Sequence, residues 1–181
     1  LLSYHTAYLK QHHTAAFMAA NMSLTMDDTE KVKILVEDSI EVCGLTILPP
    51  DVNLSAYRFR PDGAPRSVTG KKVTNIRYGL GGVKGAGQNA IEAIIAARDA
   101  DGPFTSLFDF CRRVDKKQIN RRTIESLIRS GAFDCLGIDR AILLASVGFA
   151  MECADQEAKA ANQVSLFGGD DSDLVAPPEY V

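Results

Sequence analysis

The sequence has few of the residues from which metal centres, disulfides and membrane spans are built. Its 181 residues include four cysteines and three histidines, and no Cys-x-x-Cys pair occurs. His12 and His13 diverge by about 100° on a helix, and no further His or Cys lies at ligand spacing. We therefore expect no metal site, and we interpret the cysteines as buried free thiols in a reducing cytosol. No apolar run has the length of a membrane span and no signal peptide is present, so we expect no membrane partner and a cytoplasmic location.

The residues of a complete active site are also missing. There is no spaced set of carboxylates for a two-metal site, no nucleophile motif and no Walker-type loop. We therefore predict no catalytic residue and no cofactor in this chain. The chain also lacks an initiator Met and opens in the middle of an apolar pattern, so we expect it to be a piece of a longer protein.

Charge is distributed unevenly around a formal total of −3. The stretch 58–129 holds fifteen Lys/Arg and seven Asp/Glu, a local balance of +8, and the remainder holds five basic and sixteen acidic residues, or −11. The negative total argues against an avid, free-standing nucleic-acid binder. The basic middle nevertheless leaves room for contacts with an anionic partner.

The first 80 residues divide into a helical part and a short β part. Residues 1–50 carry apolar residues at three- and four-residue intervals, and residues 27–30 supply an N-cap and an acidic first turn for a helix from Lys31 to about Val42. Pro49 and Pro50 end this part. In residues 51–80, two strand-like runs at 57–60 and 73–80 predict a small antiparallel hairpin. Its basic loop over residues 63–75 is either a phosphate contact or a solvated tip.

The most informative stretch is residues 78–91, which contains a glycine-rich turn followed by an amphipathic helix running to about Arg98. Gly85 and Gly87 flank one apolar residue, Ala86, so we expect the backbone to turn there with positive φ. A glycine turn at a helix N-terminus leaves amide groups pointing outward, which suits an anion. From these residues alone, a phosphate site and an ordinary tight loop both remain open.

A second unit of the same layout follows about 50 residues later. Ser106 or Thr105 caps a short helix from Leu107 to about Arg113, and Asn120 is a credible N-cap for a helix with an apolar face and an arginine face. A tight hairpin over residues 130–137 then leads into another helix from about Asp139. Two such hairpins side by side can hold two points of one nucleic-acid backbone, and this repetition favours phosphate binding.

The C-terminal residues 156–181 become Ala-rich, then acidic and Pro-containing, and predict a flexible tail. One island interrupts it, formed by Gln163, Val164, Ser165, Leu166 and Phe167. A polar residue followed by a Leu-Phe pair has the form of a docking peptide. Folding of Leu166 and Phe167 back onto the preceding helix is the alternative.

Together these motifs resemble the bacterial DNA polymerase III alpha subunit family over residues 3–168. Residues 3–10, 17–20 and 48–51 are similar to its fingers region. Five stretches are similar to its helix-hairpin-helix segment, namely residues 78–81, 83–87, 107–111, 120–122 and 130–134. The pentapeptide 163–167 is similar to the family's internal clamp-binding motif. The long basic loop around residues 63–75 departs from the family pattern.

The resemblance implies a non-catalytic portion of a DNA-directed DNA polymerase, a nucleotidyltransferase of DNA replication. The catalytic aspartates, and the Mg²⁺ they hold, belong to a palm domain that nothing here matches. The implied partners are duplex DNA, the sliding clamp (the beta subunit) and other polymerase III holoenzyme subunits. Lys10 and Arg77 are candidates for contact with an incoming nucleotide. A protein-interaction module that chiefly docks the clamp, with little DNA binding of its own, is the alternative.

We thus predict a mainly α fold, a helical bundle segment with a small β-hairpin and tandem helix-hairpin-helix motifs. The expected divisions are a helical end of the fingers (1–50), a β-hairpin connector (51–80), the tandem DNA-binding region (81–155) and a flexible tail with the pentapeptide (156–181). The predicted DNA-binding residues are Lys84, Gly85, Ala86, Gly87, Gln88, Arg121, Arg122, Gly131 and Ala132. The predicted clamp-binding residues are Gln163, Val164, Ser165, Leu166 and Phe167.

Overall fold

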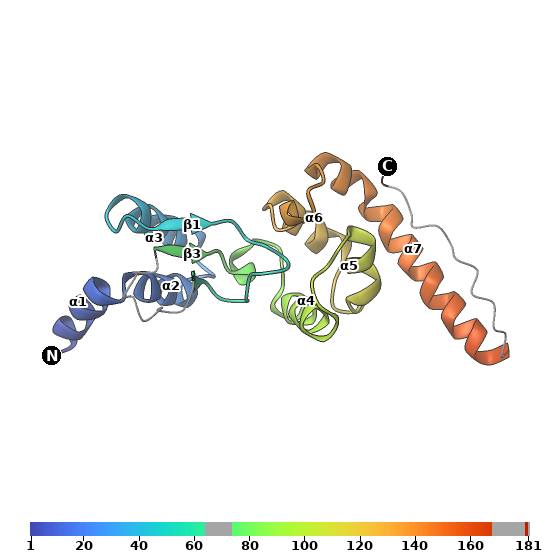
Figure 1. The fold of residues 1–181 in the computed structure, drawn as a ribbon, viewed down its shortest axis with the longest axis horizontal. Helices are drawn as coiled ribbons and strands as arrows, with labels where there is room; N and C mark the ends of the chain where they lie inside the picture. The colour runs from blue at the N-terminus through green and yellow to red at the C-terminus, as the bar shows by residue number, and fades with distance from the viewer. Residues whose placement is uncertain (64–73, 168–179, 181) are drawn as a thin grey trace.

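The fold is mainly helical, as the sequence predicts, and consists of two packed groups of elements (Figure 1). The computed structural model describes residues 1–63, 74–167 and 180, with the backbone alone for 161–167. Residues 64–73 of the basic loop, residues 168–179 and residue 181 lie outside this part of the chain. Helices α1–α3 and the sheet form the N-terminal group, and helices α4–α7 form the C-terminal group.

Three helices open the chain: α1 (Leu2–His12), α2 (Thr14–Leu24) and α3 (Thr29–Glu41). Helix α3 begins where the sequence predicts a cap, because the Asp28 carboxylate accepts a hydrogen bond from the Lys31 amide at 3.2 Å. Helix α2 buries Met18 and Met22 in the smaller of two hydrophobic clusters. Helix α1 contributes no buried residue and projects from the end of the molecule (Figure 1).

The β part is a three-stranded sheet with the order β1-β3-β2. Strands β2 (Arg60–Asp62) and β3 (Asn75–Arg77) pair antiparallel, with Pro61 opposite Ile76, which is the predicted hairpin in shorter form. Strand β1 (Thr46–Leu48) adds a parallel pairing to β3, with Ile47 opposite Ile76, which the sequence analysis missed. Only three residues form β1, too few for a recognisable alternation, and its partner lies about 30 residues further along the chain.

Residues 51–80 pack against the elements on both sides of them. Phe59 and Ile76 lie in the same buried cluster as Met18 and Met22, so the sheet and the preceding helices share one core. Within the same stretch, Val52 and Leu80 belong to the larger cluster of the C-terminal group. Residues 51–80 therefore contribute side chains to both hydrophobic clusters.

The C-terminal group contains α4 (Gln88–Asp101), α5 (Leu107–Arg113), α6 (Arg121–Arg129) and α7 (Arg140–Phe167), with 3₁₀ turns η1 (Leu80–Gly82) and η2 (Asp134–Leu136). The caps of α5 and α6 are confirmed, because Ser106 Oγ accepts from the Asp109 amide and Asn120 Oδ1 from the Thr123 amide. Fully buried aromatic rings lie at the centre of the larger cluster: Phe104, Phe110 and Phe133.

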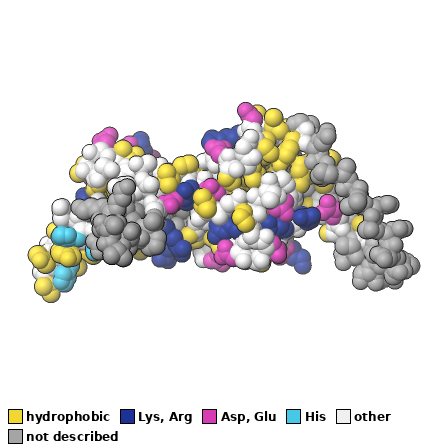
Figure 2. Space-filling model, viewed as in Figure 1, with side chains coloured by type: hydrophobic (Ala, Val, Ile, Leu, Met, Phe, Trp, Pro, Cys, Tyr) yellow, Lys and Arg dark blue, Asp and Glu magenta, His cyan; other side chains and the backbone are white. Residues whose placement is uncertain are grey.

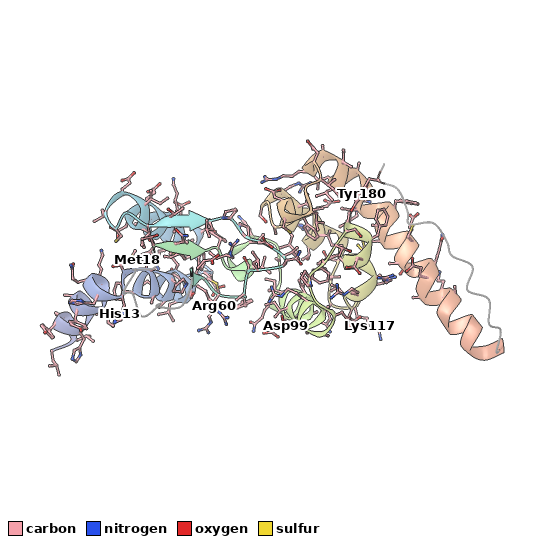
Figure 3. All side chains as sticks on the ribbon, in the orientation of Figure 1. His13, Met18, Arg60, Asp99, Lys117 and Tyr180 are labelled. Atoms are coloured by element: carbon pink, nitrogen blue, oxygen red, sulfur yellow. The ribbon has the colours of Figure 1, made fainter. Side chains whose placement is uncertain are left out.

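Helix α7 continues past residue 156, where the flexible tail was predicted to begin. It packs on α5 and α6 through buried residues at helical spacing (Leu143, Val147, Ala150 and Ala154) and then continues to Phe167. The continuation follows from composition, since residues 155–167 are rich in good helix formers and contain no Gly or Pro. Tyr180 returns to this group, where its hydroxyl accepts a hydrogen bond from the Leu107 amide at 3.1 Å (Figure 3).

On the face of the molecule shown in Figure 2, the Lys and Arg side chains of the described residues do not gather into one patch. In the view of Figure 2, Lys and Arg side chains are spread over the middle of the molecule and interleaved with Asp and Glu, whereas hydrophobic and His side chains dominate the end that carries α1. Among the described residues, no helix is long and apolar enough to cross a membrane. The same residues contain no cluster of three or more His, Cys, Asp or Glu suited to a metal ion.

Candidate nucleic-acid interface

The first hairpin ends in an exposed helix N-terminus. Gly85 turns the chain with φ +92°, and the Ala86 amide donates to the Val83 carbonyl at 3.1 Å. Gly87 is the N-cap of α4 with φ −71°, so the expectation of positive φ holds for Gly85 and is wrong for Gly87. A glycine cap has no side chain to accept from the first-turn amides, and Gln88 is exposed. These amides and the helix dipole make this end attractive to an anion.

Helix α6 fixes the position of this hairpin. The Thr123 hydroxyl donates to the Gly85 carbonyl at 3.4 Å, and a Cβ added at Gly85 would lie 3.0 Å from Ser126 Oγ. Thr123 itself is buried and sits in the first turn set by the Asn120 cap. A side chain at residue 85 would therefore crowd Ser126 unless the Ser126 hydroxyl turned aside.

A hollow of about 380 Å³ lies between the first hairpin and the end of α6. Its charged members are Lys84, which is exposed, and Arg129, whose side chain is 65% exposed. Burial raises the pKa of the Tyr78 hydroxyl, which therefore stays a neutral donor at its edge. The residues that line it are Pro50, Tyr78, Gly82, Val83, Lys84, Ser126, Arg129 and Ser130.

Arg129 is a member of this site that the sequence analysis did not select. The predicted arginines of the same helix, Arg121 and Arg122, are both exposed but lie at its first turn, two turns away from Arg129. Glu125 lies between Arg121 and Arg129, at 2.8 Å and 3.5 Å from them, and so offsets part of their charge. Arg129 could have been selected from its spacing in the sequence, because it follows Ser126 by three residues and so lies on the same face of the helix.

The second hairpin is built differently from the first. Gly131 and Ala132 are buried, and their amides donate to the carbonyls of Ile128 and Leu127 at 3.0 Å. They close the C-terminal end of α6, so the amides that we predicted to face a phosphate are already used within the chain. The two hairpins therefore do not present equivalent amide groups to a ligand.

The surface over the second hairpin carries an ion pair of its own. The hydrogen bond from Arg140 lowers the pKa of the Asp134 carboxyl, which therefore remains charged. Asp134 and Arg140 line a shallow hollow, and Asp139 lines it as well. A phosphate at this hairpin would thus meet carboxylates as well as the guanidinium group.

The remaining predicted residues lie apart from these two hairpins. The pentapeptide 163–167 occupies the last turns of α7. Lys10 and Arg77, considered for nucleotide contact, each pair with a carboxylate, Lys10 with Asp38 at 3.2 Å and Arg77 with Asp62 at 2.5 Å.

Comparison with known proteins agrees with a helix-hairpin-helix arrangement of this region. A family described as helix-hairpin-helix motif matches residues 44–143, which span both hairpins and the helices around them. The chain therefore belongs to the helix-hairpin-helix motif family. Its curated relatives are more specific. It is 49% identical over 92% of its length to DNA polymerase III subunit alpha of Neisseria meningitidis serogroup B, and 49% identical over 93% to that of Escherichia coli K12.

DNA polymerase III subunit alpha of Vibrio cholerae is a further relative, 48% identical over 93% of the chain. The resemblance to the alpha-subunit family is thus confirmed. In each case the chain spans about 14% of the length of the relative. It corresponds to a segment of such a subunit.

Proposed function

We propose that this chain is a non-catalytic, DNA-binding segment of a replicative DNA polymerase and that it holds the backbone of duplex DNA without reading its sequence. The observation that carries the proposal is the first hairpin, which ends in the exposed N-terminus of α4 and whose Lys84 lines one hollow together with Arg129 of α6. Amide groups and side-chain cations of this kind bind phosphate oxygens and carry no base-edge contacts. We further propose that the protein acts in the bacterial cytoplasm with other holoenzyme subunits.

A salt series tests the proposal. Fluorescence anisotropy with a mixed-sequence duplex of about 20 base pairs should show affinity that falls linearly with log salt concentration, because phosphate neutralisation releases counterions. Lys84→Ala with Arg129→Ala should weaken binding on all sequences alike and lower the slope by about 1–2.

A matched control removes two exposed cations far from the hairpin along the chain, Lys33→Ala with Lys117→Ala. Its duplex affinity should stay close to that of the unaltered chain. Salt-insensitive binding, or equal losses in the two double variants, would contradict phosphate contact at the first hairpin. Arg121→Ala with Arg122→Ala asks whether the other face of α6 contributes, and we expect a smaller loss because Glu125 already pairs with Arg121.

A second candidate function is docking on the sliding clamp through residues 163–167. Its support is the sequence pattern together with the position of this stretch at the end of α7, beyond Ala154, the last buried residue among the side chains that the structure describes in that helix. Leu166→Ala with Phe167→Ala should abolish binding of the chain to purified bacterial clamp in surface plasmon resonance and leave duplex affinity intact. Glu157→Ala, an exposed change on the same helix, is the control. Unchanged clamp binding in the double variant would remove this assignment.

A further inference from the structure

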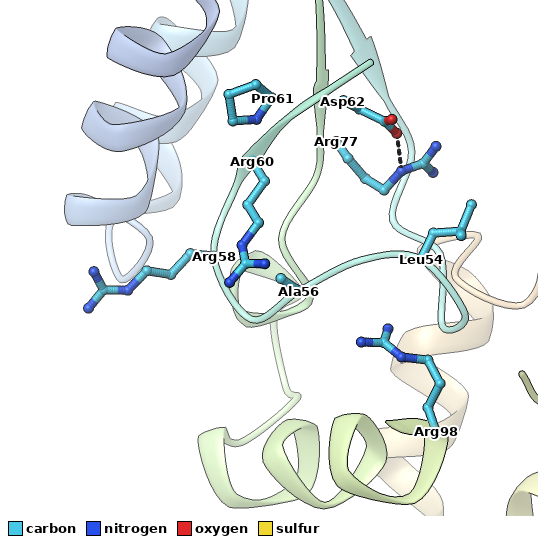
Figure 4. A pocket seen from close by; sticks show the side chains of 8 residues that line it. All are labelled: Leu54, Ala56, Arg58, Arg60, Pro61, Asp62, Arg77 and Arg98. Carbon is cyan, nitrogen blue, oxygen red and sulfur yellow. Dashed lines mark hydrogen bonds and ion pairs between the residues drawn. The ribbon is translucent and has the colours of Figure 1, made fainter. Parts of the chain in front are cut away.

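A second hollow, lined by arginines, lies between the small sheet and helix α4 (Figure 4). Its volume is about 230 Å³. It shares no lining residue with the hollow at the first hairpin. We refer to it as the arginine hollow, and its lining residues are Leu54, Ala56, Arg58, Arg60, Pro61, Asp62, Arg77 and Arg98.

The charges of the arginine hollow do not balance internally. Asp62 is its only carboxylate among the lining residues, and it pairs with Arg77 at 2.5 Å. Arg98 Nε pairs with Asp99 at 3.2 Å. Arg58 and Arg60 are exposed and have no ion pair within the described part of the chain. The sequence 64–73, which joins β2 to β3, contains no Asp or Glu that would neutralise them.

Two of these guanidinium groups reach the hollow from opposite walls. Arg60 points toward it from β2, and Arg98 extends into it from α4 (Figure 4). Arg98 is held in place, because its Nη1 donates to the Ser55 carbonyl at 2.8 Å and to the Val52 carbonyl at 3.4 Å. Only 15% of its side chain is exposed, so its orientation is largely set before any ligand arrives. Because Nε and Nη1 of Arg98 are already bonded within the chain, the planar guanidinium fork of Arg60 is the one that matches the oxygens of a phosphate.

Size restricts what can enter. Sites for whole small molecules usually enclose about 300–1,000 Å³, and this hollow is smaller. It suits one phosphate group rather than a complete nucleotide. We propose that the arginine hollow binds one phosphate of a nucleic-acid strand, as a second backbone contact separate from the first hairpin.

That this phosphate belongs to a nucleic-acid strand rests on the proposed function. Arg98 lies ten residues after Gln88 on the same helix, about 15 Å along the axis at 1.5 Å per residue. That separation equals about four to five nucleotides of one strand along a duplex at 3.4 Å per nucleotide. A single bound duplex can therefore reach both ends of α4.

The experiment compares two pairs of substitutions in the 181-residue chain. Arg58→Ala with Arg60→Ala removes exposed cations that have no ion pair in the described structure, so folding should be preserved, and far-UV circular dichroism melting checks this. We expect this variant to bind the 20-base-pair duplex on the order of tenfold more weakly at 0.1 M salt, with a salt slope lower by about 1–2. Lys33→Ala with Lys117→Ala is the charge-matched control and should change neither. Arg58→Lys with Arg60→Lys should keep the slope and lose part of the affinity, since lysine keeps the charge without the fork.

Each other outcome overturns the inference in a recognisable way. Unchanged duplex binding in the Arg58/Arg60 variant, alongside weakened binding in the Lys84/Arg129 variant, removes the arginine hollow and leaves the first hairpin in place. Equal losses in the variant and the charge-matched control mean that net charge alone matters. Loss of dATP binding without loss of duplex binding assigns the hollow to a free nucleotide, and loss of binding to a poly-glutamate probe alone assigns it to an acidic protein.

Discussion

The pair Gly85 and Gly87 gives the sharpest test of the first hairpin. Both glycines lie in one five-residue stretch, yet the structure gives them opposite requirements. Gly85 has φ +92°, which side chains rarely adopt, and its position would bring a Cβ to 3.0 Å from Ser126 Oγ. Gly87 has φ −71°, and a Cβ there meets nothing within 4 Å. Gly85→Ala should therefore be costly and Gly87→Ala tolerated.

The magnitude follows from the backbone. A non-glycine residue in the left-handed region costs about 1–2 kcal/mol, and the contact with Ser126 adds less because its hydroxyl can rotate away. Gly87→Ala loses a favourable N-cap residue, which lowers stability, but it also lowers the conformational entropy of the unfolded chain, which raises stability. The free energy of unfolding should therefore stay within about 0.5 kcal/mol of the unaltered chain. Adding Ser126→Ala to Gly85→Ala should recover only the contact part.

Urea unfolding followed by circular dichroism measures both variants. With an m value of about 2 kcal/mol/M, Gly85→Ala should lower the midpoint by about 0.5–1 M at unchanged m. It should also weaken duplex binding, because backbone strain at residue 85 disturbs the turn that precedes the N-terminus of α4. Equal midpoints for the two variants, or a larger loss for Gly87→Ala, would refute the assignment of the turn to Gly85.

Three further predictions concern other parts of the chain. Gly79→Ala should lower the free energy of unfolding by about 3 kcal/mol in urea melts, because its Cβ would lie 2.6–2.7 Å from the backbone of residues 57–59. The Leu80 and Gly81 amides hold this stretch in place by donating to the carbonyls of Ala56 and Tyr57. A midpoint near that of the unaltered chain would contradict this packing. Arg140 lowers the pKa of Asp134, so the pair stabilises the fold above the ordinary value of 3.8 and loses this contribution as the pH falls through the lowered folded value. In Arg140→Gln, the free energy of unfolding should therefore fall less steeply as the pH drops below about 4. An unchanged pH dependence would show that the pair does not contribute. Burial raises the pKa of the Cys111 thiol to about 12, so Ellman's reagent at pH 8 should leave it unmodified in native protein and modify it in urea, as peptide mass spectrometry would show.

Features set by neighbouring residues could be predicted from the sequence. The caps at Asp28, Ser106 and Asn120 each form the predicted hydrogen bond, because a cap depends on a side chain and an amide three residues away. The mainly helical fold and the antiparallel pairing of β2 with β3 were also predicted, because they too depend on patterns among neighbouring residues. The extent of α7 was underestimated, since the change of composition near residue 156 was given more weight than the absence of helix breakers before Gly168.

The sequence by itself determined the membership of the helix-hairpin-helix family and the kinship with polymerase alpha subunits, because these rest on motifs in order along the chain. The tertiary structure decided which parts of those motifs face solvent. It buried Gly131 and Ala132, exposed the turn at Gly85, and brought Arg129 to Lys84 and Arg98 to Arg60. Each of those cation pairs joins residues about 40 positions apart, and such distances depend on how helices and strands pack rather than on local propensity. The physical reason is that propensity and capping act within a turn or two, whereas a binding surface is made by contacts between segments.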